Sequence, residues 1–289
     1  MNKMILDCGN LCHIAYHSLP EMNRFEKSTA VIFGFMNLLF SYQERFKPRD
    51  LIFCWDSRKS YRKIICPTYK LRPESTDEEK EEKQVLYDQM DEIRTKVLPF
   101  LGFKNNFMKT GYEADDLIAH IVRNYDDQYI IVSTDQDLYQ LLSEDVCIYS
   151  PVKKVIISEK AFIDDYGVLP NQWSMVKALG GCSSDNVIGI KGVGEKTAIK
   201  YINGILPTHH KSYVSITSDE GQKTKRKNYR LTNLPFVNVN KLDIELFSQP
   251  PLDDASFINF FEEYGFNSFL SNIEQWKYTF NLLNGDIPF

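Results

Sequence analysis

Tyr129-Ile-Ile-Val-Ser-Thr-Asp135 is the stretch that decides the fold, because it is a short, continuous apolar run that ends in an aspartate. Met4-Ile-Leu-Asp7 and Leu51-Ile-Phe-Cys-Trp-Asp56 share this pattern. Uninterrupted apolar runs are typical of strands buried on both faces of a parallel sheet. Between the first two runs, residues 28–46 carry apolar side chains at helical spacing and end before Pro48. The sequence therefore predicts an α/β fold with a mostly parallel central sheet and flanking helices.

The rest of the chain divides into two regions of different composition. Residues 57–100 begin basic and continue as an acidic helical segment, which indicates an insertion standing away from the sheet. Further helices are predicted near 113–125 and 136–142. After Asp165 the chain consists of helical segments joined by Gly- and Pro-containing turns. We therefore expect an N-terminal α/β domain over 1–160 and a C-terminal helical domain over 161–289, with 208–228 as an exposed loop.

Composition limits the class of protein. The chain has 289 residues and a formal net charge of −5, and 43% of its residues are hydrophobic. No apolar run approaches the roughly 20 residues that cross a bilayer, and the N-terminus lacks the pattern of a signal peptide. Six cysteines without a C-x2-C pair predict reduced thiols rather than disulfides or a zinc knuckle. We expect a cytoplasmic protein without membrane contact, whose basic residues gather at 58–72, 191–200 and 211–230.

Acidic residues form the most informative pattern. Asp7, Asp56 and Asp135 each follow a predicted strand, so they should meet at the carboxyl edge of the sheet. Glu113-Ala-Asp115-Asp116 and Asp135-Gln-Asp137 add two clusters. A single such acid could be a turn or cap residue, and acids favour a first helical turn. Several carboxylates at one edge are costly unless cations neutralise them.

The ligand chemistry indicates the metal. Oxygen ligands without histidine suit Mg²⁺ or Mn²⁺ rather than Zn²⁺. Two such ions can activate a water and stabilise the leaving oxygen of a phosphodiester. The acids therefore predict metal-assisted phosphoryl transfer to water.

A glycine-rich hairpin leads into a predicted helix. Gly189-Ile-Lys-Gly-Val-Gly-Glu-Lys-Thr-Ala198 is not a P-loop, because Glu195 stands where that motif needs lysine. The pattern is typical of the turn of a helix-hairpin-helix, here at about 185–203, whose backbone amides take a DNA phosphate without reading sequence. The alternative is an ordinary surface helix start. The candidate DNA-binding residues are Lys191, Gly192, Gly194, Lys196 and Thr197.

The basic start of the insertion is a second candidate nucleic-acid surface. Tyrosines alternate there with basic residues, an arrangement that could stack an unpaired base and pair with its phosphates. The alternative is a solvated charged face. The candidate DNA-binding residues are Arg58, Arg62, Lys63, Tyr69, Lys70 and Arg72.

These motifs together resemble a known family. The sequence resembles the 5′-nuclease superfamily: the flap endonucleases, the bacteriophage 5′ exonucleases and the 5′-nuclease domain of bacterial DNA polymerase I. The likeness spans residues 1 to about 205. It rests on Trp55-Asp56, Tyr69-Lys70 with Arg72, Glu113-Ala-Asp-Asp116, Ser133-Thr-Asp-Gln-Asp137, and Ser183-Ser-Asp-Asn186 with the hairpin.

The resemblance implies a resolvase-like (PIN-like) α/β domain whose 57–100 insertion is a helical arch. It implies that Lys70 and Arg72 contact the scissile phosphate, with Asp116 also catalytic, and that K⁺ binds at the hairpin. The implied activity is that of a 5′-3′ exonuclease and flap endonuclease in primer removal or repair. The implied substrate is DNA with a free 5′ end or flap, or an RNA/DNA hybrid, and we expect a monomer. The implied ligands are Asp7, Asp56, Glu113, Asp115 and Asp116 for one Mg²⁺ or Mn²⁺ ion, and Asp135, Asp137 and Asp185 for the other.

This chain departs from the family pattern twice. Cys182 stands where relatives usually have aspartate, which predicts a weaker second metal site because a thiol is a poor Mg²⁺ ligand. The Tyr69-Lys70 motif is followed by arginine one residue earlier than usual.

Three alternatives compete with a 5′-nuclease. The chain could be a non-catalytic binder of DNA ends with vestigial carboxylates, which Cys182 favours. A phosphatase using Asp7 as nucleophile would need an aspartate where Gly9 stands. A PIN-type ribonuclease would be shorter and would lack the glycine hairpin.

Overall fold

The computed structural model describes residues 2–19, 23–24, 27–72, 76–237 and 242–283. Two compact units make up the chain, and both are discontinuous in sequence. The predicted boundary near residue 160 does not match this division. The first unit is Met1–Trp55, Glu74–Phe107 and Glu245–Phe289, and the second is Asp56–Pro73 and Met108–Ile244.

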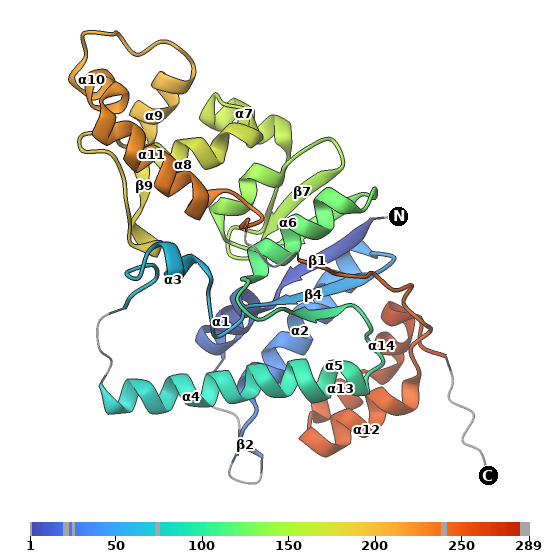
Figure 1. Ribbon diagram of the computed structural model, residues 1–289. Helices are drawn as coiled ribbons and strands as arrows, with labels where there is room; N and C mark the ends of the chain where they lie inside the picture. The colour runs from blue at the N-terminus through green and yellow to red at the C-terminus, as the bar shows by residue number, and fades with distance from the viewer. Residues whose placement is uncertain (1, 20–22, 25–26, 73–75, 238–241, 284–289) are drawn as a thin grey trace. The chain divides into compact units, whose positions relative to one another are not determined.

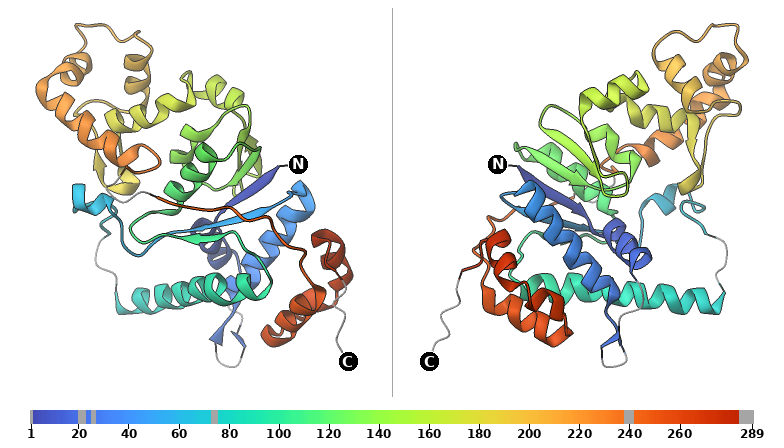
Figure 2. Two further views of the ribbon diagram at one scale, coloured as in Figure 1. Left: turned by 45° about the vertical axis from the view of Figure 1, so that its right-hand side comes forward. Right: turned by 180° about the vertical axis from the view of Figure 1, so that it is seen from behind.

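The first unit contains the predicted strand-helix-strand element. β1 (Lys3–Asp7) and β4 (Leu51–Trp55) pair in parallel, and α2 (Ala30–Phe46) connects them, as the sequence predicted. β5 (Asn106–Met108) lies next to β4. The sequence did not predict α1 (Cys8–Ser18), which starts directly after β1 and lies with α2 on one side of these strands (Figure 2).

Helices from residues 77–100 and from the C-terminal part of the chain complete this unit. A long helix, α4 (Asp77–Glu92), begins at a capping box and continues through a π-helical turn (Ile93–Val97) into α5 (Leu98–Phe100). The last three helices are α12 (Asp254–Tyr264), α13 (Asn267–Leu270) and α14 (Ile273–Phe280) (Figure 1).

Aromatic contacts explain why the C-terminal helices belong to the first unit. The rings of Phe33 on α2 and Phe269 stack with centroids 4.4 Å apart, and the ring centroids of Phe40 and Trp276 are 4.7 Å apart. Tyr264 donates a hydrogen bond to Glu92 at 2.8 Å. Periodicity could not predict this return of the chain, because it reports a buried helix face but not its partner.

The second unit contains the strands β6 (Tyr129–Val132), β7 (Val146–Ser150) and β8 (Val155–Ile157). β6 pairs in parallel with β7, and β8 adds an antiparallel edge. α6 (Ala114–Asn124) precedes β6 as predicted, whereas the segment predicted as a helix at 136–142 is the 3₁₀-helix η2 (Gln136–Leu141).

The remainder of this unit is helical. It comprises α3 (Arg62–Ile65), α7 (Glu159–Tyr166), α8 (Trp173–Gly180), α9 (Glu195–Ile202), α10 (Lys211–Thr217) and α11 (Asp219–Thr232), with a short 3₁₀ turn, η3 (Pro170–Gln172). Between α8 and α9, β9 (Gly181–Cys182) and β10 (Val187–Ile188) form a hairpin around the 3₁₀ turn η4 (Ser183–Asp185).

The predicted loop at 208–228 is wrong, because α10 and α11 occupy most of it. Ser218 caps α11 by accepting a hydrogen bond from the Gly221 amide at 3.1 Å. Buried Asn228 then anchors the helix through hydrogen bonds from its amide nitrogen to the carbonyls of Ala178 and Ile188. A polar, lysine-rich composition concealed the few residues that attach α11 to α8 and β10.

The predicted fold class is confirmed: a mostly parallel sheet with flanking helices, and a helical region in the C-terminal half of the chain. Among the described residues, no helix has the length and apolar character needed to cross a membrane.

Candidate metal centre

The first acidic cluster forms where α6 begins. Asp56 follows β4 and accepts a hydrogen bond from the Ala114 amide at 2.9 Å, which ties it to the start of that helix. Glu113 is the N-cap residue of α6, and Asp115 and Asp116 lie in its first turn. Surrounding protein desolvates the Asp56 carboxyl and raises its pKa. The structure therefore brings these four predicted acids together.

Glu113 is surrounded by donors. Its carboxylate accepts hydrogen bonds from Ser60 Oγ at 2.7 Å, Tyr69 OH at 3.1 Å and Lys70 Nζ at 2.7 Å. Burial alone would raise the pKa of Glu113, but the charges of Arg62 and Lys70 lower it. Glu113 is therefore held as a carboxylate. The Lys70 ammonium contacts this carboxylate where a bound metal ion would otherwise contact it.

Asp116 is enclosed by hydrogen-bond donors. Its Oδ2 accepts from Arg62 Nη1 at 2.6 Å and from the Glu113 amide at 3.0 Å, and its Oδ1 accepts from Arg62 Nη2 at 2.8 Å and the Phe236 amide at 2.6 Å. The side chain is fully buried. Four donors occupy both oxygens and hold the first turn of α6, so Asp116 offers no free ligand atom in this arrangement, and its participation in metal binding or catalysis stays a prediction.

Asp115 offers the free ligand atom that Asp116 lacks. Its Oδ1 is buried and has no hydrogen-bond partner, while its Oδ2 lies 3.7 Å from Arg62 Nη2. Burial raises the pKa of Asp115, although Arg62 opposes this effect. A buried carboxylate oxygen without a donor needs an explanation, and a bound cation is the simplest one.

Arg62 and Tyr69, two of the predicted DNA-binding residues, are buried in this structure. The Arg62 side chain is 1% exposed and also donates from Nε to the Leu231 carbonyl, and Tyr69 is 2% exposed. The sequence shows basic and aromatic residues in alternation, but it does not show which side chains of α3 and the following loop face inward. Arg58 and Lys63, by contrast, are exposed.

Lys70 connects the acidic cluster at the start of α6 with a second acidic cluster that includes Asp185. It has a left-handed backbone, with φ of 48°, and its amide donates to the Asp185 carbonyl at 2.9 Å while its side chain holds Glu113. Asn186 fastens the same loop by donating to the carbonyls of Thr68 and Leu71. Arg72 is exposed and forms no ion pair with the described residues.

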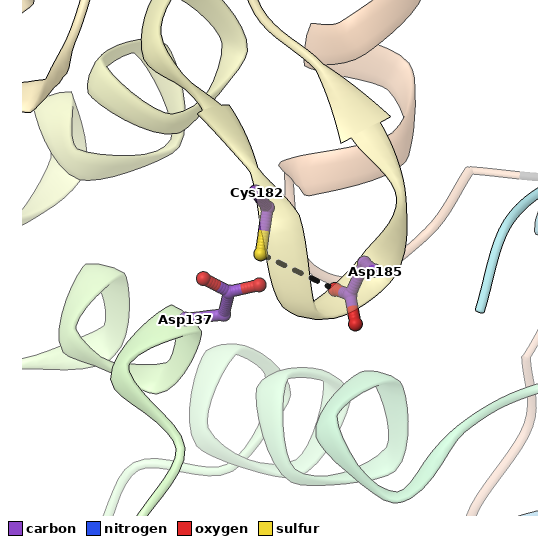
Figure 3. A group of neighbouring side chains, drawn as sticks. All are labelled: Asp137, Cys182 and Asp185. Atoms are coloured by element: carbon purple, nitrogen blue, oxygen red, sulfur yellow. Dashed lines mark hydrogen bonds between the residues drawn. The ribbon is translucent and has the colours of Figure 1, made fainter. Parts of the chain in front are cut away.

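The second cluster consists of Asp137, Cys182 and Asp185 (Figure 3). One ligand atom from each lies within 4.8 Å of the others. Burial, together with the charge of the neighbouring Asp135, raises the pKa of Asp137 to about 7. Asp135 itself is exposed and caps η2 by accepting from the Asp137 amide at 2.8 Å. A sulfur among oxygens does not suit Mg²⁺, which selects oxygen ligands.

The glycine hairpin packs too closely for side chains. A Cβ on Gly189 would overlap the Gly180 carbonyl, and the Ile190 amide donates to the Leu179 carbonyl at 2.9 Å. Gly192 has φ of 77° with open space around it, as expected of a tight turn. Of the predicted DNA-binding residues here, Lys191, Gly192, Gly194 and Lys196 are exposed, while Thr197 is half-buried.

A groove of about 700 Å³ lies beside this hairpin, along α11. Its basic residues are Lys191, Lys223 and Lys227, and sequence analysis did not single out the latter two individually.

Asp7 belongs to the first unit. Its carboxylate caps α1 by accepting from the Asn10 amide at 3.2 Å. Its participation in metal binding stays a prediction.

The fold and the acidic clusters define a resolvase-like α/β domain. Residues 2–167 match the model of the 5′-3′ exonuclease N-terminal resolvase-like domain. The chain therefore belongs to the 5′-3′ exonuclease family, as its motifs implied.

Known relatives agree with this assignment. The chain is 35% identical over 266 residues to DNA polymerase I of Mycobacterium leprae, covering 88% of this chain but only 28% of the polymerase. It is 30% identical to the 5′-3′ exonuclease of Aquifex aeolicus, covering 84% of this chain and 78% of that protein. The chain thus spans about a quarter of the polymerase relative and most of the exonuclease.

Solved structures share the fold. The T5 D15 protein, co-crystallised with metal ions, superposes with a TM-score of 0.71 at 23% identity, covering 81% of this chain and 90% of that chain. The catalytic core of Rad2 in complex with DNA superposes with a TM-score of 0.55 at 15% identity, covering 91% of this chain and 87% of that chain.

Proposed function

We propose that this protein hydrolyses phosphodiester bonds near the 5′ ends of DNA, as a 5′-3′ exonuclease and flap endonuclease that needs Mg²⁺ or Mn²⁺. The observation that carries the proposal is the cluster at the start of α6, where Asp115 keeps a buried oxygen without a donor beside Asp56 and Glu113. The name of the Aquifex aeolicus relative, a 5′-3′ exonuclease, supports the reaction class.

The residues of the first cluster have separate roles in this proposal. Asp56, Glu113 and Asp115 hold one divalent ion. That ion supplies a water nucleophile of lowered pKa when bound. Asp116 and Arg62 are positioning residues, because their mutual hydrogen bonds fix the first turn of α6. The second ion belongs to Asp135, Asp137 and Asp185.

Lys70 supports phosphate binding in the same proposal. Its side chain is 38% exposed although its ammonium contacts buried Glu113, so it can reach a phosphate that enters the cluster. Arg72 would assist from the exposed part of the same loop.

The hairpin between α8 and α9 is the proposed duplex anchor. The first amides of a helix have no acceptor within the helix, and Gly194 at the N-cap of α9 allows a phosphate to approach them. In this proposal the segment at about 185–203 acts as a helix-hairpin-helix, exposed Lys191 and Lys196 pair with phosphates, and K⁺ binds the hairpin carbonyls.

Other parts of the proposal concern the biological setting. RNA/DNA hybrids are the second substrate, which fits primer removal. The active form is a monomer, and the protein acts on DNA in the cytoplasm.

The test is cleavage of a 5′-labelled flap duplex in Mg²⁺, in Mn²⁺ and in chelator. Asp115→Asn removes the charge of the oxygen that has no donor, so it should abolish cutting without breaking a hydrogen bond. Asp164→Asn, at an exposed acid on α7, is the matched control and should cut normally. Metal-independent cutting, or full activity in Asp115→Asn, would refute the proposal.

A second candidate function is binding of DNA ends without hydrolysis. Cys182 favours it, because the sulfur lies among the ligands of the second ion. Gel-shift binding of the flap duplex without any metal-dependent product would establish this alternative.

A further inference from the structure

Asp137, Cys182 and Asp185 point into one space from two segments of the second unit. Asp137 lies on η2, whereas Cys182 and Asp185 lie on β9 and η4. Figure 3 shows the Cys182 sulfur next to the Asp137 carboxylate, with a hydrogen bond to the Asp185 carboxylate. Three potential ligands therefore converge, and one of them is a thiol.

The Asp137 carboxylate is an independent sign of a missing cation. Its side chain is 13% exposed, yet it accepts no hydrogen bond from any residue that the structure describes. Lys177 Nζ forms a long ion pair with Asp137 Oδ1 at 3.9 Å, without a hydrogen bond, so the carboxylate is only partly compensated. Nearly buried carboxylates in folded proteins are almost always paired or bound to a metal.

One distance already suits a small tetrahedral site, and the three ligand atoms all lie within 4.8 Å of one another. Zn²⁺ binds cysteine sulfur at about 2.3 Å and carboxylate oxygen at about 2.1 Å, so those ligand atoms stand roughly 3.6 Å apart. Cys182 Sγ and Asp185 Oδ2 are 3.7 Å apart. The loop would need little rearrangement to take such an ion, with a fourth position open.

Ligand chemistry separates the candidate ions. Mg²⁺ requires near-octahedral oxygen coordination and binds thiols poorly, whereas Zn²⁺ and Co²⁺ accept mixed sulfur and oxygen ligands. The ion that the family resemblance implies at this position therefore does not fit the residues present.

We propose that Asp137, Cys182 and Asp185 form a site that selects a thiophilic divalent ion, such as Zn²⁺, over Mg²⁺. The geometry of these three residues carries the inference. Only the role of the site in catalysis rests on the proposed function. It makes the ion at this site chemically different from the ion held by the carboxylates around Asp115.

Cobalt is the probe that tests this site, because a thiolate bound to Co²⁺ gives an ultraviolet charge-transfer absorption that oxygen ligands do not give. The full-length protein should develop this absorption on titration with Co²⁺. Added Zn²⁺ should remove it, and a large excess of Mg²⁺ should not. Cys182→Ser keeps a small polar side chain and should abolish the band and weaken Co²⁺ binding about tenfold or more.

Cys147→Ser is the matched control, since Cys147 is the other half-buried cysteine of the chain. It should retain the band. Circular dichroism of each variant shows that loss of the band is not loss of folding.

The inference is overturned if equilibrium dialysis finds Co²⁺ bound to the wild type without the band, or if Cys182→Ser binds Zn²⁺ as tightly as the wild type. Flap cleavage in Mg²⁺, measured on the same samples, separates the two proposals: cleavage without the cobalt band keeps the nuclease and removes this site.

Discussion

Replacing Asp116 by asparagine should destabilise the protein strongly, although the change removes only one charge. Asp116 is fully buried and its two oxygens meet Arg62 at 2.6 and 2.8 Å. Removing one partner of a buried ion pair costs roughly 3–5 kcal/mol, because the other charge stays buried without compensation. A domain's whole stability is about 5–15 kcal/mol. Asp116→Asn should therefore lose a large part of it.

Asp137→Asn is the matched comparison for this prediction. It removes an aspartate that is also nearly buried, but one with no hydrogen-bond donor among the described residues. Because the neutral amide avoids the cost of burying a charge, the metal-free variant should be at least as stable as the wild type.

Urea unfolding followed by circular dichroism, in chelator, measures both effects. If Asp116→Asn unfolds within about 1 kcal/mol of the wild type, well below the cost expected for a broken buried pair, Asp116 is not the structural anchor that its contacts indicate.

Four further outcomes are expected. Cys182→Asp should lower the Mg²⁺ concentration for half-maximal cleavage, because it replaces sulfur by a hard ligand; an unchanged titration would refute this. Lys70→Met should tighten Mn²⁺ binding, measured by calorimetry, because the lysine now occupies a ligand carboxylate, while flap cleavage falls. The pKa of Asp137 is raised from 3.8 to about 7, so its protonated form is favoured on folding. The metal-free protein should therefore lose stability as pH rises between these values, and Asp137→Asn should reduce this slope in urea unfolding. Gly189→Ala should weaken flap-duplex binding in a gel-shift assay by forcing the hairpin open, because its Cβ would overlap the Gly180 carbonyl.

The strands and the acids that follow them could be predicted from sequence, because both depend on local patterns. A buried parallel strand is a short apolar run, and its carboxyl end is where an aspartate can reach a ligand. Asp56, Glu113 and Asp115 therefore met as expected. The helices at 211–232 could not be predicted in this way, because their lysine-rich composition is also typical of a loop.

The distinction between Asp115 and Asp116 could not come from the sequence. The two acids are neighbours in one helical turn, and their order gives no sign of which one faces a donor. The Asp116 partners lie 54 and 120 residues away, at Arg62 and the Phe236 amide. Only the folded chain brings these donors together.

Arg62 also explains how a crowded acidic cluster is stable without a metal. Its guanidinium lies within 3.7 Å of Glu113, Asp115 and Asp116, but it donates hydrogen bonds only to Asp116 and the Leu231 carbonyl. The buried positive charge reduces repulsion among all three acids, while the ligand oxygen of Asp115 stays free of donors. The cluster can therefore be assembled before any metal arrives, because the charge that stabilises the fold and the oxygen available to a metal belong to different residues.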